Sequence, residues 1–226
     1  QAAGVRRYIR AEKIVSVPKP KPYQWGNLLR GIAGSRPLSV LNYMSPEMRR
    51  ALATLPAPSE FDLVHVDGIH MMGYAELFPS VKIVYNWHNI ESELMRRYSS
   101  TVHSRVRSSY AAHTASKLER LEQEILQTTF GHVVCSERER AQLQRRAPAA
   151  RITVMENGVD TQYFAASESQ PETAIETPFR IVFAGKMDYY PNVDAMTWFA
   201  RGIWPAIRER IPSIRLSIVG SDPTPA

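Results

Sequence analysis

Short apolar runs alternate along the chain with longer segments in which apolar residues recur at helical spacing. Strands are expected at the apolar runs 62–66, 81–85, 132–135, 152–155, 179–184 and 214–219. A further run, 13–18, predicts a strand that ends at a proline. Helices are expected at 23–33, 45–55, 68–77, 89–98, 102–128 and 192–210. Strands that alternate with helices are typical of βαβ units, so the pattern predicts an α/β fold with parallel sheets.

Local residues indicate where helices begin and which faces they bury. Ser45 precedes Pro46 at the start of one helix, and Ser136 with Glu139 has the spacing of a capping box. The expected buried positions of the two longest helices are Leu118, Leu121, Ile125, Leu126, Ala195, Trp198, Phe199 and Ile203. The charged positions of the first of these helices are expected to form a solvated face: Glu119, Arg120, Glu122 and Glu124.

Polar residues and glycines follow the predicted strands. Ligands of open parallel sheets bind beyond the carboxyl ends of the strands, so these residues predict a cleft. The candidates in chain order are Asp67, Gly68, His70, His88, Asn89, Glu91, Ser136, Asn157, Gly158, Gly185, Lys186 and Asp188. The pattern alone does not name a reaction, because the chain has no G-x-G-x-x-G, P-loop or G-x-S-x-G motif.

Several candidates also have a purely structural interpretation. For Asn89 and Glu91 this interpretation is capping of their helix, and for Asn157-Gly158 it is a tight turn that needs a positive φ. For Ser136 the capping role is the preferred interpretation. For Lys186 the structural alternative is an ordinary surface lysine. His65 and His70 are a weak candidate for a metal pair, since a histidine inside a strand is more often a core residue. No metal site is therefore predicted.

Composition places the chain among globular proteins, with 44% hydrophobic and 22% charged residues among 226. No apolar run is long enough to span a membrane, and the start has no signal-peptide pattern. A single cysteine, Cys135, excludes an internal disulfide and suits a reducing compartment. Residues 1–50 carry ten Lys/Arg against two acids. The preferred interpretation of this segment is a solvated basic face, and the alternative is attraction to anionic lipid or nucleic acid.

Several of these segments, taken in order, resemble retaining glycosyltransferases of the GT-B fold in the large family 4 group. The similar segments are Val133–Glu137, Glu156–Asp160 with Tyr163-Phe164, Phe183–Asp188, Pro191–Asp194 and Ile218–Gly220. Arg36–Ser39 and Tyr43–Pro46 are similar to the sugar transferases of bacterial exopolysaccharide clusters.

The resemblance implies two Rossmann-like domains. It places a partial N-terminal, acceptor-side domain at 1–164, a linker at 165–178 and the start of a donor-binding domain at 179–226. The family's first strands and its later donor segment have no counterpart here. The resemblance therefore implies an internal fragment of a longer enzyme, inactive alone.

The resemblance also implies roles for individual residues. His88 matches a catalytic histidine near the transferred sugar, and Lys186 matches a basic residue that contacts the donor diphosphate. Gly185, Asp188 and Asn192 match the same donor-binding loop. The acceptor or cleft-lining positions are Asp67, Gly68, His70, Asn89, Glu91, Ser136, Asn157 and Gly158.

The implied function is transfer of a sugar from a UDP- or GDP-linked donor to a lipid-linked or polysaccharide acceptor. This retaining transfer would serve exopolysaccharide synthesis in the cytoplasm, at the inner face of the plasma membrane. No cofactor is expected, and the absence of a D-x-D motif favours a metal-independent reaction. The alternatives are a non-catalytic sugar- or nucleotide-binding module, an inactive remnant and, more weakly, a nucleic-acid binder, which no motif supports.

Overall fold

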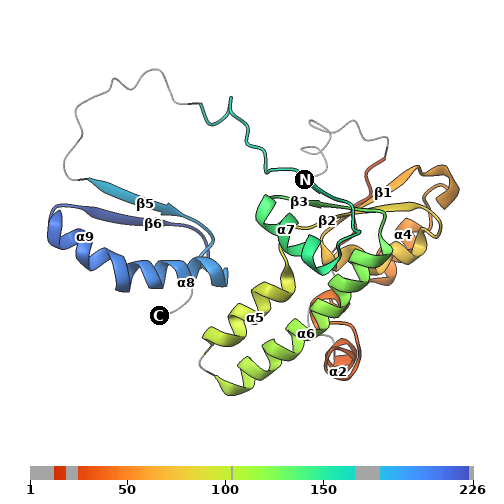
Figure 1. Cartoon of the computed structure of the whole chain (residues 1–226), viewed down its shortest axis with the longest axis horizontal. Helices are drawn as coiled ribbons and strands as arrows, with labels where there is room; N and C mark the ends of the chain where they lie inside the picture. The colour runs from red at the N-terminus through yellow and green to blue at the C-terminus, as the bar shows by residue number, and fades with distance from the viewer. Residues whose placement is uncertain (1–12, 19–24, 103, 166–178, 224–226) are drawn as a thin grey trace. The chain divides into compact units, whose positions relative to one another are not determined.

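The computed structural model describes residues 13–18, 25–102, 104–165 and 179–223 (Figure 1). Internal contacts divide the chain into two compact units, Gln1–Gly158 and Val159–Ala226. Most of the predicted linker, 166–178, lies outside the described residues. The domain limits expected from the sequence stay predictions.

A four-stranded parallel sheet forms the centre of the first unit (Figure 1). Its strands, in the spatial order β1-β2-β3-β4, are β1 (Leu63–Asp67), β2 (Lys82–Asn86), β3 (Gly131–Val134) and β4 (Ile152–Val154). All neighbouring pairs are parallel, which confirms the parallel α/β prediction for this unit. Residues 13–18 form no strand, so that prediction was wrong.

Helical segments precede β1 and connect the strands that follow it in the first unit. They are α2 (Trp25–Ala33), α3 (Leu38–Leu41), α4 (Pro46–Leu52), η1 (Pro58–Glu60), η2 (Ile69–Leu77), α5 (Glu91–Thr101), α6 (Arg105–Thr128) and α7 (Glu137–Arg146). The Ser45 side chain accepts a hydrogen bond from the Met48 N–H, as the capping prediction required. The helix expected at 68–77 is a 3₁₀ helix, η2.

The core lies between the sheet and the long helix α6. Leu118, Leu121, Ile125 and Leu126 are all buried, as the helical spacing predicted. Beneath the carboxyl end of β2 lies Trp87, only 1% exposed. Its indole packs edge-to-face on Tyr85, with the ring centroids 4.9 Å apart, and its Nε1–H donates to Nδ1 of the buried His132 at 3.4 Å.

A buried lysine connects α2 to α6. The Lys117 side chain, on α6, donates from Nζ to the carbonyl oxygens of Gly31 at 2.7 Å and Ile32 at 2.9 Å. These carbonyls belong to the last turn of α2, where a positive charge is favourable. Lys117 is 5% exposed, so its ammonium group is enclosed by this contact.

The second unit contains one pair of parallel strands, β5 (Arg180–Ala184) and β6 (Arg215–Val219). The helix expected at 192–210 is divided into α8 (Tyr190–Trp198), the π-helical segment η3 (Phe199–Ile203) and α9 (Trp204–Arg210). Phe199 and Ile203 are partly buried, as expected. Ala195 and the 66% exposed Trp198 are not, so their assignment to the core was wrong. A two-stranded sheet covers only one face of the helix, and these two residues lie off it.

None of the helices in the described residues is long and apolar enough to cross a membrane.

Candidate functional site

The parallel register of β1 and β2 places two predicted polar strand ends side by side. Asp67 is the register partner of Asn86, whose Nδ2–H donates to Asp67 Oδ1 at 2.7 Å. The same oxygen lies 3.0 Å from His88 Nε2. One carboxylate thus joins the amide that ends β2 to the imidazole two residues later. The Asp67 and His88 side chains are each more than half exposed, so this pair is open to a ligand.

The backbone on both sides fixes the position of His88. Its neighbour Trp87 is buried and donates its backbone N–H to the Val133 carbonyl at 2.8 Å. On the β1 side, Gly68 has a φ of +86° and donates its N–H to Asn86. A Cβ built at Gly68 would lie 3.4 Å from His88 Cδ2. The glycine therefore permits a turn that brings the backbone against the imidazole ring.

The environment keeps the Asp67 carboxylate ionised. Partial burial acts to raise its pKa, but the hydrogen bond from Asn86 and the charge and hydrogen bond of His88 lower it more, and the pKa lies below its ordinary value. The ionised carboxylate faces His88 Nε2 and orients the imidazole ring. With Nε2 engaged by Asp67, the other ring nitrogen, Nδ1, can form a hydrogen bond with a bound ligand.

Glu91 and Asn89 do not cap α5 in the way the structural interpretation supposed. The N-cap residue is Ile90, which provides no side-chain cap, and the Ser92 N–H donates instead to Glu122 Oε1 at 2.8 Å. Glu91 is partly buried. Burial, and then the charge of Glu122, raise its pKa, while hydrogen bonding to Asn89 and the charge of His88 lower it less.

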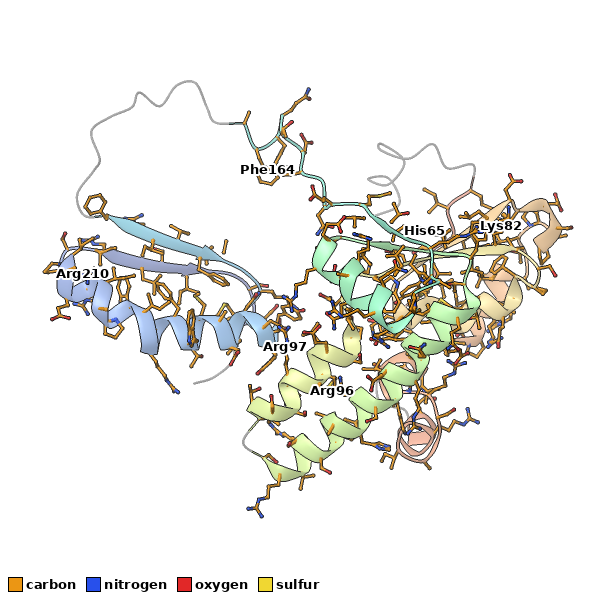
Figure 2. All side chains as sticks on the ribbon, in the orientation of Figure 1. His65, Lys82, Arg96, Arg97, Phe164 and Arg210 are labelled. Carbon is orange, nitrogen blue, oxygen red and sulfur yellow. The ribbon has the colours of Figure 1, made fainter. Side chains whose placement is uncertain are left out.

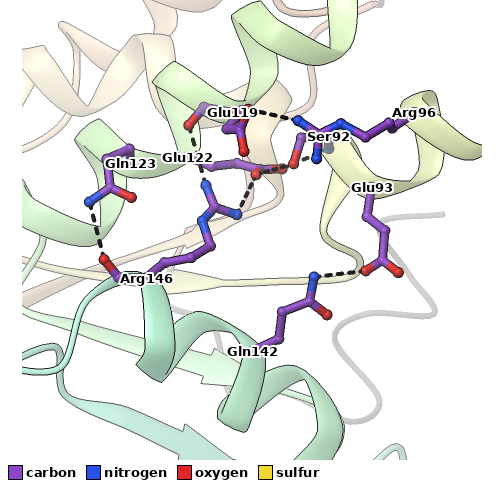
Figure 3. A network of polar contacts seen from close by, with 8 residues as sticks. All are labelled: Ser92, Glu93, Arg96, Glu119, Glu122, Gln123, Gln142 and Arg146. Atoms are coloured by element: carbon purple, nitrogen blue, oxygen red, sulfur yellow. Dashed lines mark hydrogen bonds and ion pairs between the residues drawn. The ribbon is translucent and has the colours of Figure 1, made fainter. Parts of the chain in front are cut away.

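Glu122 is the centre of a buried polar network that sequence reasoning missed (Figure 3). Its side chain is completely buried, which corrects its assignment to a solvated face. Besides the Ser92 N–H, its carboxylate accepts the Ser92 hydroxyl at 2.5 Å and Arg146 Nη1 at 2.8 Å. This joins the start of α5, the middle of α6 and the end of α7. A helix-face count could not separate Glu122 from its exposed neighbours, because its partners lie 24 or more residues away.

A pocket opens between the beginnings of α5 and α7, and it brings two predicted cleft residues together. It is lined by Asn89, Ile90, Glu93, Leu94, Arg97, Ser136, Arg138, Glu139 and Gln142. Ser136 also caps α7, because its Oγ accepts from the Glu139 N–H at 3.3 Å. Its hydroxyl donates to Glu139 Oε2 at 3.0 Å, which the Cys135 thiol also reaches at 3.0 Å. The Glu139 carboxylate raises the pKa of the Cys135 thiol.

Four other histidine and loop candidates do not line this pocket. His70 lies in η2 and packs on the Tyr43 ring, with centroids 4.5 Å apart. His65 is exposed on the edge strand β1, so its assignment to the core was wrong. Asn157 and Gly158 are exposed in an irregular segment, and Gly158 does not have the positive φ of the predicted tight turn.

In the second unit, the predicted donor residues gather where β5 and β6 end. The Lys186 Nζ lies 2.9 Å from Asp188 Oδ2 and 3.7 Å from Asp222 Oδ2. The Asn192 side chain donates to the Lys186 carbonyl at 2.9 Å. Hydrogen bonding and the charge of Asp188, with a smaller part from Asp222, raise the Lys186 pKa. Asp222 is the member of this cluster that sequence reasoning missed.

Glycines allow these two loops to approach closely. The Gly185 N–H donates to the Val219 carbonyl at 2.9 Å, and the Met187 N–H donates to the Ser221 carbonyl at 2.9 Å. A Cβ at Gly220 would lie 1.8 Å from the Gly185 carbonyl oxygen, so no other residue fits there without a backbone shift. The Lys186 ammonium is therefore presented on a loop with a fixed backbone.

The parallel sheets, with helices between their strands and polar residues at the carboxyl ends of those strands, define a Rossmann-like α/β protein. The sequence model of Glycosyltransferase Family 4 matches residues 6–163, and the chain belongs to that family. Membership confirms the predicted transferase class and implies a sugar donor and an acceptor. No match to a curated protein was found. The roles predicted for single residues stay predictions.

Proposed function

We propose that the protein transfers a sugar from a UDP- or GDP-linked donor to a lipid-linked or polysaccharide acceptor, with retention and without a metal. In this proposal it is a GT-B enzyme of cell-surface glycan synthesis in the cytoplasm. The first unit supplies the acceptor side and His88, and the second unit the donor side. The observation that carries it is the His88–Asp67 pair, exposed at the carboxyl edge of a parallel sheet in a family 4 chain.

The chemistry needed from this chain is stabilisation of charge at the bond that breaks. As the bond to the sugar breaks, negative charge develops on the leaving diphosphate. The Lys186 ammonium provides a positive charge for the diphosphate. The diphosphate would compete for this ammonium with its present partners, Asp188 and Asp222. His88 donates a hydrogen bond near the sugar, and Asp67 keeps its ring oriented. Asn192 holds the backbone of the Lys186 loop.

The test, made on the full-length parent protein, is consumption of UDP-, GDP- and ADP-sugars by the wild type and by the His88→Ala and Lys186→Ala variants, with and without a chelator. We expect the wild type to consume one donor, and each variant to lose about 100-fold or more in rate. His113→Ala and Lys82→Ala are matched controls, because His113 lies on α6 and Lys82 at the opposite end of β2. The anomeric configuration of the product, read by NMR, tests retention.

Three results would each count against a part of the proposal. A donor that raises the melting temperature without being consumed would favour the non-catalytic binding module. Activity that the chelator abolishes would exclude the metal-independent route. Inversion at the anomeric carbon would keep the transferase and remove the retaining mechanism.

We further propose that the basic N-terminal segment contacts anionic lipid. Within residues 1–50, Arg36, Arg49 and Arg50 form ion pairs with Glu124, Glu76 and Glu47, so their charges are already partly compensated. The proposal concerns the other basic residues of the segment, most of which lie outside the described residues: Arg6, Arg7, Arg10, Lys13, Lys19, Lys21 and Arg30.

Reversal of the charges of these seven residues should abolish binding to phosphatidylglycerol vesicles at low salt. The matched variant, with Arg36, Arg49 and Arg50 changed to Gln, should bind nearly as well as the wild type. Unchanged binding after the reversal would remove the membrane contact from the proposal.

A further inference from the structure

The pocket between α5 and α7 adjoins the His88 loop through the chain itself. Asn89, which follows His88, is one of its lining residues, and the loop after β3 provides Ser136 on the opposite side. Both loops leave the carboxyl edge of the same sheet. A group bound in this pocket therefore contacts the loop that carries His88, whose imidazole the proposed function places near the transferred sugar.

The charges in the pocket compensate one another. Glu93 forms ion pairs with Arg97 and, at 3.4 Å, with Arg138, and it accepts Gln142 Nε2 at 3.0 Å (Figure 3 shows the last contact). Burial acts to raise the Glu93 pKa, but the hydrogen bonds from Gln142 and Arg97 and the nearby arginine charges lower it more. Glu139 supplies a second carboxylate, so two carboxylates stand against two guanidinium groups. This balance gives no preference for a phosphate or for a cation.

The lining instead matches the hydrogen-bonding surface of an uncharged sugar ring. Carboxylates accept hydrogen bonds from hydroxyl groups, and guanidinium and carboxamide groups donate to them in fixed planar geometries. Ile90 and Leu94 add an apolar part of the wall, against which the C–H face of a ring can pack. Arg97, which extends from α5 beside Arg96 (Figure 2), and Arg138 are more than half exposed. Their outer nitrogens can turn toward a ligand while Glu93 stays paired.

We propose that this pocket is the subsite for a neutral hexopyranose ring of the acceptor, recognised by Glu93, Arg97, Arg138 and Gln142. The inference rests on the proposed function, because it assigns the acceptor's chemical class. It goes further in choosing a neutral sugar over a phosphate or another charged group as the part of the acceptor that this pocket recognises.

Direct binding tests the subsite without any donor. Saturation-transfer NMR would be measured on the whole protein with the methyl α-glycosides of glucose, galactose and mannose. We expect at least one glycoside to bind, and Arg97→Ala and Gln142→Ala to weaken that binding about tenfold or more. The matched controls are Arg96→Ala and Arg140→Ala, since each neighbouring arginine pairs outside the pocket, with Glu119 and Glu137. Melting temperatures report whether each variant folds.

The outcomes separate this inference from the proposed function. No glycoside binding, equal binding by all pocket variants, or displacement of the glycoside by inorganic phosphate would each overturn the sugar subsite, whether or not a donor is consumed. Glycoside binding that needs Arg97 and Gln142, in a protein that consumes no donor, would support the subsite and remove the transferase proposal. With an active enzyme, the pocket variants should raise the acceptor KM more than they lower kcat.

Discussion

The two units hold their candidate site residues by different physical means. In the first, His88 follows Trp87, which is 1% exposed, and the helix after it is tied to a completely buried carboxylate, Glu122. In the second, Lys186 is held by two exposed carboxylates, and Trp198 is 66% exposed. The position of His88 therefore depends on buried packing, which solution conditions alter little. The position of Lys186 depends on ion pairs at the surface, which salt or a bound phosphate can rearrange.

The largest effect is expected from Glu122→Ala. Removing one partner of a buried ion pair leaves Arg146 uncompensated and the start of α5 without its acceptor, so the free energy of unfolding should fall by about 3–5 kcal/mol. Urea unfolding measures this. The matched change is Glu119→Ala, on the same helix as Glu122. It removes only an exposed ion pair with Arg96 of α5 and should cost less than about 1 kcal/mol. Similar losses for both would contradict the contrast between buried and surface contacts.

Gly68→Ala is expected to have an intermediate effect. A φ of +86° with a ψ of +153° is a conformation that side chains with a Cβ rarely adopt, so the substitution should cost about 1–3 kcal/mol. Activity should fall with it, because relief of the strain would shift the backbone beside the His88 ring, whose Cδ2 lies 3.4 Å from the new Cβ. Gly158→Ala is the control, since its Cβ would meet nothing within 4 Å, and its unfolding free energy should stay within about 0.5 kcal/mol.

Acid should weaken the first unit before its ordinary carboxylates titrate. Burial lowers the pKa of His132, so the unfolded chain takes up a proton at a higher pH than the folded one. The stability that the neutral ring provides is fully present above its ordinary pKa of about 6.5 and is lost as the pH falls below it. A proton on Nδ1 would also face the Trp87 N–H. The melting temperature of the wild type should fall between about pH 7 and pH 5.5, and His132→Gln should flatten that slope. An unchanged slope in the variant would assign the acid effect to other groups.

The smallest effect is expected from Trp198→Ala. Because this indole is mostly exposed, its loss should change the unfolding free energy by less than about 0.5 kcal/mol. Hydrogen exchange in β5 and β6 is the measurement. A large loss of protection there would show that Trp198 packs on its own unit in solution. The second unit would then depend on side-chain packing more than its exposed Trp198 indicates.

Sequence periodicity predicted the strands of both sheets and the buried face of α6, because each depends on neighbours a few residues apart. It failed where a long-range partner decides. Residues 13–18 have the apolar pattern of a strand but pair with no other strand, and Trp198 has the spacing of a core residue but lies off the covered face.

The same limit applies to the site. The position of His88 at a strand end was visible in the sequence, and so was Ser136 as a cap. Asn86, Glu93, Gln142 and Asp222 were not selected, because their roles come from contacts made across the sheet edge or between helices. Runs of polar residues at strand ends predict the edge on which a site lies, and the fold decides which of them meet.

The enclosed ammonium group of Lys117 gives the protein a built-in chemical reporter. Amine-acylating reagents need an accessible, unprotonated amine, and this one is shielded between α6 and the last carbonyls of α2. Lysines on the surface, such as the exposed Lys82, should be modified quickly while Lys117 stays inert for as long as α2 remains docked. Mass-spectrometric reactivity at this single position would therefore record whether α2 leaves α6 when the protein meets a lipid surface.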